Sequence, residues 1–169
     1  MGHLAVKFGA KGIGHRIIGI DHSSKRDLVL ETGAEHFIAF DETKDVVAAV
    51  KEVTGGLGAH AAVICTASNA AYAQGLEFLR FRGTLVCVGI PEGDMVPIAT
   101  ALPQTMVAKA LKIVGSAVGD RREAIETLDF AARGVVKTHY TVEKMDKLTS
   151  VFESMDKGQM KGRVVLDLQ

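Results

Sequence analysis

The sequence predicts an α/β fold built on a doubly wound, mostly parallel β-sheet. Short runs rich in β-branched residues alternate with longer segments of helical periodicity, and Gly-containing turns separate them. Some of the short runs, such as residues 61–64 and 84–88, stay apolar at successive positions instead of alternating with polar residues. Uniformly apolar strands are typical of parallel sheets that carry helices on both faces. With 169 residues, 47% of them hydrophobic, the chain is long enough to bury one sizeable core.

The first part of the chain carries the alternation of strands and helices. Strands are expected at residues 16–21, 36–39, 61–66, 83–89 and 111–115. Helices are expected between them, at residues 25–32, 45–54, 69–79 and 104–110. All three prolines fall in the irregular stretch from residue 91 to residue 103, which predicts a loop and a short helix beside a binding crevice.

The character of the sequence changes after Gly119. Two more strongly charged helical segments follow, at residues 121–132 and 144–157, together with strand candidates at residues 138–142 and 163–168. We therefore expect one domain over residues 1–119 and a separate C-terminal segment over residues 120–169.

Glycines crowd the N-terminal region, in the run Gly9-Ala10-Lys11-Gly12-Ile13-Gly14. A glycine-rich loop that binds phosphate must lead into a helix, whereas a strand candidate at residues 16–21 follows these glycines. We therefore favour a helix over residues 4–11, ended by Gly12 or Gly14 in a left-handed conformation. A phosphate loop at the glycines and a strand over residues 4–8 are the alternatives.

The strand candidate at residues 16–21 ends in a carboxylate, Asp21. At the carboxyl edge of a parallel sheet, this side chain could accept hydrogen bonds from the hydroxyls of an adenosine ribose. It would also repel a 2′-phosphate, which favours NAD over NADP. The alternative is that Asp21 caps the following helix. Lys25 and Arg26 lie just beyond it and could contact the same ribose or simply be solvated.

Charge and composition exclude several classes of function. Twenty basic residues balance twenty acidic ones, so no net charge attracts the protein to nucleic acid or to an anionic membrane surface. The chain has neither a signal-peptide pattern nor an apolar run of membrane-spanning length, and we expect it to be cytoplasmic. Cys65 and Cys87 are expected to be buried, reduced thiols, and the six histidines form no metal-binding pattern.

Several segments together resemble the medium-chain, zinc-type alcohol dehydrogenases, and most closely the fungal and yeast enzymes. The segments that carry the resemblance are residues 2–7 (GHLAVK), 19–21 (GID), 31–35 (ETGAE), 83–91 (GTLVCVGIP), 112–119 (KIVGSAVG), 124–134 (AIETLDFAARG) and 157–165 (KGQMKGRVV). They keep the order and spacing of the family and span essentially the whole chain.

The resemblance implies a Rossmann-like, NAD-binding fold that lacks its usual first strand. Gly2 would match the last glycine of the GxGxxG motif, so the first strand and the zinc ligands are expected upstream of Met1. Without its central strand the sheet would split into two halves with unpaired edges, unless residues 4–8 fill the gap. The chain would then be the NAD-binding portion of an alcohol dehydrogenase, inactive alone, with zinc only in the complete enzyme. The alternative is a non-catalytic nucleotide-binding or protein-interaction module.

The resemblance also implies a set of cofactor contacts and a homodimer. The expected contacts are Gly2 and Arg163 at the pyrophosphate, Asp21 and Lys25 at the adenosine ribose, Thr66 and Ala67 after their strand, Val88, Gly89 and Ile90 beside the nicotinamide, and Ser116 and Val118 at its carboxamide. For the apolar members, ordinary strand packing is the competing interpretation. No catalytic residue or metal ligand is expected within the chain. Because the family often dimerises across its last strand, here near residues 111–114, a homodimer is expected.

Overall fold

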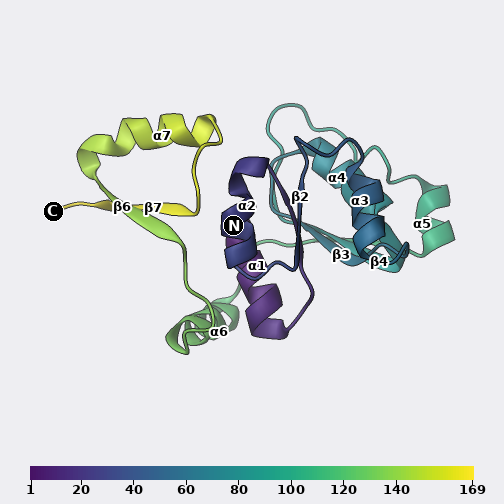
Figure 1. Ribbon diagram of the computed structural model, residues 1–169, viewed down its shortest axis with the longest axis horizontal. Coiled ribbons are helices and arrows are strands. Elements are labelled where there is room, and N and C mark those ends of the chain that lie inside the picture. The colour runs from purple at the N-terminus through teal and green to yellow at the C-terminus, as the bar shows by residue number, and fades with distance from the viewer.

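The computed structural model describes all 169 residues, and it arranges seven strands into three small parallel sheets with helices around them (Figure 1). The strands are β1 (Ile18–Asp21) and β2 (His36–Ala39) in the first sheet, β3 (Ala59–Ile64), β4 (Leu79–Cys87) and β5 (Lys112–Gly115) in the second, and β6 (Tyr140–Lys144) and β7 (Arg163–Asp167) in the third. Every hydrogen-bonded strand pair is parallel, which confirms the predicted α/β class.

Helices alternate with the strands, as the sequence periodicity predicts. They are α1 (Gly2–Lys7), α2 (Arg26–Glu31), α3 (Val46–Val53), α4 (Asn69–Glu77), α5 (Pro103–Lys109), α6 (Arg121–Ala132) and α7 (Leu148–Asp156), with the π-helical stretch η1 (Phe8–Ile13) and the 3-10 turns η2 (Ser23–Lys25) and η3 (Met145–Lys147). Side chains cap the first turns of several helices. Asp45 accepts from the N–H of Ala48 at the start of α3, and Asp120 forms a capping box with Glu123 at the start of α6.

The N-terminal region is helical, and Gly14 ends it. Helix α1 runs directly into η1, a π-helical stretch, and Gly14 follows in a left-handed conformation with φ of 81°. The helical prediction is therefore confirmed, and the phosphate-loop and strand alternatives are wrong. The internal glycines allow close packing: a Cβ on Gly9 would lie 2.7 Å from Cδ1 of Ile17, and one on Gly12 would lie 3.1 Å from Cε1 of Phe130.

The first sheet is covered on both of its faces. Val6 of α1 and Val29 of α2 are buried together on one face. On the opposite face, Ile38 of β2 is buried with Val46 and Val50 of α3 in the main hydrophobic core. This is the doubly wound arrangement that the sequence predicts.

The second sheet is covered on one face only. Helix α4 lies so close to this face that a Cβ on Gly75 would come within 2.8 Å of Cδ1 of Leu85. On the other face of β3, the side chain of Val63 is 52% exposed. The apolar run of β3 predicts a strand covered on both faces, and that prediction is wrong, because α1 and α2 pack over the first sheet instead.

The first and second sheets are not hydrogen-bonded to each other. Strand β1 pairs only with β2, and β3 pairs only with β4, so each leaves one edge unpaired. Side chains join the two sheets instead, since Ile18 and Ile20 of β1 pack against the core that β3 and β4 share. The predicted split of the sheet is confirmed, and residues 4–8 do not fill the gap because they belong to the N-terminal helix.

The C-terminal segment forms a small β–α–β unit beside the other two sheets, seen with α7, β6 and β7 on the left of Figure 1. Helix α6 precedes this unit and contacts the N-terminal region, where the ring of Phe130 meets the ring of Phe8 edge to face, with centroids 5.3 Å apart. None of the helices combines the length and the apolar character that a membrane crossing requires.

Candidate functional site

The carboxyl ends of β3, β4 and β5 bring several of the predicted contact residues to one edge. The N–H groups of Val88 and Gly89 donate to the carbonyl of Ile64 at 3.2 and 2.8 Å, and the N–H of Ser116 donates to the carbonyl of Cys87 at 2.9 Å. The residues that follow these three adjacent strands, Thr66 among them, therefore share one edge. In open α/β sheets this is the edge where ligands bind.

Gly89 lies unusually close to the neighbouring strand end. A Cβ at this position would stand 2.2 Å from the carbonyl oxygen of Thr66, so no larger residue fits without moving the backbone. The hydroxyl of Tyr72, on α4, donates to the carbonyl of Gly89. Burial raises the pKa of Tyr72, which keeps the phenol protonated and able to donate. The backbone of Gly89 is thus held from two sides.

Exposed apolar side chains gather at the same strand ends. Ile90 is 84% exposed and Val118 is 99% exposed. Val88, which also follows β4, is half-buried. Apolar side chains beside backbone donors and acceptors are the usual lining of sites for flat, partly apolar ligands.

A second group of polar residues follows β1 and β2. Asp21 ends β1 with an exposed carboxylate, and its Oδ1 accepts from the N–H of His22 at 2.8 Å. Asp41, two residues beyond β2, accepts from the N–H and the hydroxyl of Ser23 at 2.7 and 2.6 Å. These hydrogen bonds from Ser23 hold the pKa of Asp41 below its usual value. Two carboxylates therefore stand at the carboxyl edge of the first sheet.

The two cations that follow Asp21 have partners within the chain. The ammonium group of Lys25 donates to the carbonyls of Gly158, at 3.0 Å, and Met160, which links η2 to the C-terminal unit. The guanidinium of Arg26 donates to Glu42 at 3.2 Å and lies 4.9 Å from the ring centre of Phe37. The contact of Lys25 with a ribose stays a prediction.

The start of α1 holds a buried polar group without a partner. Gly2 has open space where a Cβ would stand, and the next residue, His3, is buried with no hydrogen bond to Nε2. Burial and then nearby positive charges, Lys7 and Arg163 among them, lower the pKa of His3. An anionic group bound here could pair with the unpartnered nitrogen and would be attracted by the nearby positive charges.

The lowered pKa of His3 predicts a loss of stability in mild acid. The unfolded imidazole titrates near 6.5, whereas the folded protein keeps His3 uncharged to lower pH. Below that value the unfolded chain binds a proton that the folded chain does not. The free energy of unfolding should therefore fall as pH drops below about 6.5, by at most about 1.4 kcal/mol per pH unit from this group.

Urea unfolding of the wild type and of His3→Leu at pH 7, 6 and 5 measures this effect. The variant should lose less stability between pH 7 and pH 5 than the wild type. Equal losses in the two proteins would show that His3 is not the group responsible.

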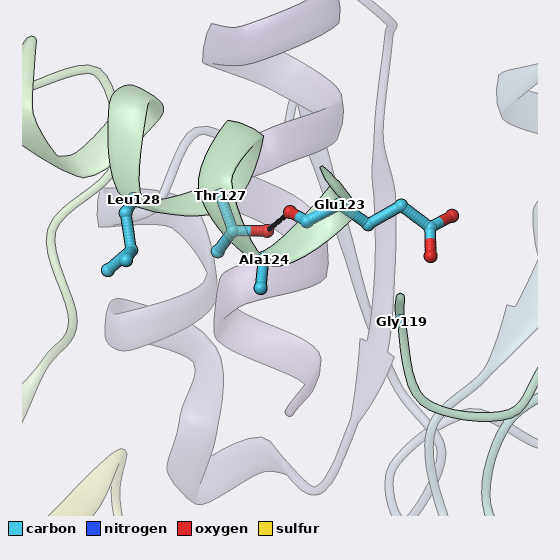
Figure 2. A pocket seen from close by; sticks show the side chains of 5 residues that line it. All are labelled: Gly119, Glu123, Ala124, Thr127 and Leu128. Carbon is cyan, nitrogen blue, oxygen red and sulfur yellow. Dashed lines mark hydrogen bonds between the residues drawn. The ribbon is translucent and has the colours of Figure 1, made fainter. Parts of the chain in front are cut away.

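A surface hollow lies on α6, away from the groups of residues described above. It measures about 380 Å³ and is lined by Gly119, Glu123, Ala124, Thr127 and Leu128 (Figure 2). Figure 2 shows the hydroxyl of Thr127 turned to the carbonyl of Glu123, to which it donates at 2.8 Å. The Glu123 carboxylate accepts from the N–H of Asp120 within the capping box. The polar groups of Glu123 and Thr127 in the hollow are therefore used in hydrogen bonds within α6 and its cap. None of the predicted contact residues lines the hollow.

The thiols and the metal-binding residue types form no reactive cluster. Cys65 and Cys87 are both free and half-buried, and burial raises the pKa of each thiol. No group of three or more His, Cys, Asp or Glu side chains is placed to hold a metal ion.

Three residues of these groups were not singled out from the sequence. Asp41 and Ser23 lie 18 residues apart, and their pairing depends on the parallel register of β1 and β2. The sequence signal for Asp41 was a carboxylate just after the second expected strand, as Asp21 is at the end of the first. No sequence signal pointed to Tyr72, because its hydroxyl reaches Gly89 from the middle of a helix.

Comparison with known proteins places the chain among dehydrogenases. A family model described as zinc-binding dehydrogenase matches residues 1–133. Alcohol dehydrogenase 2 of Emericella nidulans is 54% identical over 175 residues, which cover 99% of this chain and 48% of that protein. The chain spans about half the length of the relatives it matches.

Solved structures agree on the fold. The alcohol dehydrogenase of the archaeon Aeropyrum pernix superposes with a TM-score of 0.87 at 27% identity, covering 99% of this chain and 47% of that one. The quinone oxidoreductase of Escherichia coli in complex with NADPH superposes with a TM-score of 0.80 at 21% identity, covering 99% and 53% of the two chains.

Proposed function

The chain belongs to the zinc-binding dehydrogenase family, and we propose that it forms the NAD-binding portion of an alcohol dehydrogenase. The observation that carries the proposal is the exposed carboxylate of Asp21 at the carboxyl end of β1. In dinucleotide-binding sheets, a carboxylate at this place accepts hydrogen bonds from the adenosine ribose hydroxyls. The 54% identity with a fungal alcohol dehydrogenase supports the same assignment.

Each part of the dinucleotide has residues that fit it. The ribose would lie at Asp21, and the pyrophosphate near Gly2, Arg163 and the unpaired ring of His3. The nicotinamide would lie at the ends of β3, β4 and β5, against Val88, Gly89, Ile90 and Val118, with Thr66 and Ser116 on the adjacent strand ends. The amide and ring of a nicotinamide match the mixture of backbone polar groups and exposed apolar side chains there.

The choice of NAD over NADP must come from side chains and not from the fold. A protein of the same fold was crystallised with NADPH, so the sheet itself does not discriminate. Here the ribose end presents the carboxylates of Asp21 and Asp41, while Lys25 and Arg26 are already bonded to other groups. A 2′-phosphate would bring further negative charge to an edge where these two cations are already engaged.

The complete enzyme would oxidise alcohols to aldehydes or ketones by transferring a hydride to the bound nicotinamide. Zinc would hold and deprotonate the alcohol, and a site for it needs three protein ligands. The chain contains no group of side chains placed for this, so we propose that residues 1–169 bind the cofactor but do not catalyse the reaction alone.

The remaining parts of the proposal concern organisation. We place the cofactor-binding domain at residues 1–119 and assign residues 120–169 to the returning part of the catalytic domain. A cytoplasmic homodimer is proposed, joined along β5, whose residues are all exposed and whose outer edge is unpaired.

Calorimetric titration of the purified chain with NAD and NADP tests the proposed function. NAD should bind, with NADP at least about tenfold weaker. Asp21→Asn should weaken NAD binding about tenfold or more, since hydrogen bonds to a charged acceptor contribute roughly 1.5–3 kcal/mol. Asp27→Asn, in the exposed first turn of α2, removes a nearby charge and should leave NAD affinity unchanged.

A folded sample that gives no heat with either dinucleotide would overturn the proposal. Equal weakening by Asp21→Asn and Asp27→Asn would show that binding depends on general charge and not on the end of β1.

A further inference from the structure

Asp41 lies on the strand next to Asp21 and at the same edge. In the parallel register of β1 and β2, Asp21 is opposite Ala39, and the N–H of Phe40 donates to the carbonyl of Asp21 at 3.1 Å. Asp41 is the next residue after Phe40. The two carboxylates therefore emerge from adjacent strands at one sheet edge.

Both oxygens of Asp41 are used to hold the turn that follows Asp21. Oδ1 accepts from the N–H of Ser23 at 2.7 Å, and Oδ2 accepts from its hydroxyl at 2.6 Å. His22, between Asp21 and Ser23, donates its N–H to Oδ1 of Asp21 and places its ring nitrogen Nε2 3.5 Å from Oδ2 of Asp41. Residues 21–23 are thus fixed by hydrogen bonds at both ends.

The charge of Asp41 is not neutralised by a permanent cation. Lys25 donates to two carbonyls of the C-terminal unit, and Arg26 pairs with Glu42. His22 is the remaining group that faces Asp41, and it is charged only when protonated. Neither Lys25 nor Arg26 therefore neutralises the carboxylate of Asp41.

From this arrangement we infer that Asp41 is a second specificity-determining residue for NAD. It positions Asp21 through Ser23, and its charge adds to the repulsion of a 2′-phosphate. The inference rests on the proposed function, because it concerns the adenosine end of the same cofactor. Discrimination between NAD and NADP would then depend on two carboxylates, Asp21 at the end of β1 and Asp41 just after β2.

Two variants separate the positioning effect from the charge effect. Asp41→Asn keeps an oxygen acceptor for Ser23 but removes the charge, so NADP affinity relative to NAD should rise about threefold to tenfold, as expected for one screened charge. Ser23→Ala keeps the charge but removes the hydroxyl donor, so NAD affinity should fall about threefold to fivefold with little change in the ratio. Ser23→Thr should restore it.

Calorimetric titrations of the wild type and each variant with NAD and NADP, at two salt concentrations, provide the measurement. The gain of NADP affinity in Asp41→Asn should shrink at high salt, which a purely structural role of Asp41 would not cause. Asp27→Asn is the control for loss of a nearby charge, and thermal melts confirm folding.

The outcomes distinguish this inference from the proposed function. If Asp21→Asn weakens NAD binding while Asp41→Asn and Ser23→Ala match the wild type with both cofactors, Asp41 has no part in selection and the inference is overturned alone. If the folded wild type binds neither cofactor, both are overturned.

Discussion

Gly89→Ala is expected to lower the free energy of unfolding by about 2–4 kcal/mol and to weaken the proposed NAD binding with it. The added methyl group would stand 2.2 Å from the carbonyl oxygen of Thr66, which is backbone and cannot rotate away. The ends of β3 and β4 would have to separate, at the expense of the bonds from Gly89 to Ile64 and from Tyr72 to Gly89. Overpacking costs about 1–3 kcal/mol, and each lost hydrogen bond adds roughly 1 kcal/mol.

Urea unfolding followed by circular dichroism measures the stability, with Gly115→Ala as the matched control. Gly115 also lies at a strand end, but a Cβ there would meet nothing within 4 Å and its φ is not positive. The control should stay within about 0.5 kcal/mol of the wild type. Equal stability of the two variants would mean that the strand ends separate without cost.

Leu85→Ala is expected to lower the free energy of unfolding by about 3 kcal/mol. Leu85 is completely buried on β4, where α4 packs on the second sheet, and a truncated side chain would leave a cavity in the main core. Domains of this kind have a total stability of about 5–15 kcal/mol, so this one substitution removes a large share of it.

Leu57→Ala makes the same chemical change at a side chain that is 63% exposed and should change stability by less than about 0.5 kcal/mol. The same urea titrations provide the comparison. A loss in Leu85→Ala no greater than in Leu57→Ala would contradict the assignment of Leu85 to the main core.

The sequence was sufficient for the order and type of the elements, and less so for their bounds. Strand β4 begins at Leu79, four residues before the expected start, in a stretch that reads as the end of a helix. There Leu79 pairs with Ala59, the register then shifts, and Arg82 adopts a positive φ of 61°. An arginine in that conformation has no sequence signal, since glycine or asparagine is the usual choice.

The exposure of one face of β3 could not be predicted, because an apolar run shows only that both faces of a strand could be buried and not that both are. Which helix covers each face depends on packing between distant segments. The same limit applies to the site. The strand ends that hold Asp21, Gly89 and Ser116 follow from the parallel topology, whereas the partners of Lys25 lie 133 and 135 residues away along the chain.

The π-helical stretch from Phe8 to Ile13 has the geometry of an insertion in a helix. A π-helical turn contains more residues than an α-helical turn, so side chains beyond it are rotated relative to those of α1. Gly14, in its left-handed conformation, ends this stretch before β1 begins at Ile18. A homologue with a regular α-helix here would reach the same strand with fewer residues. Residues of the two helices are therefore equivalent when they pack against the same neighbours, as Gly9 packs against Ile17 and Gly12 against Phe130. Counting along the sequence would pair the wrong residues.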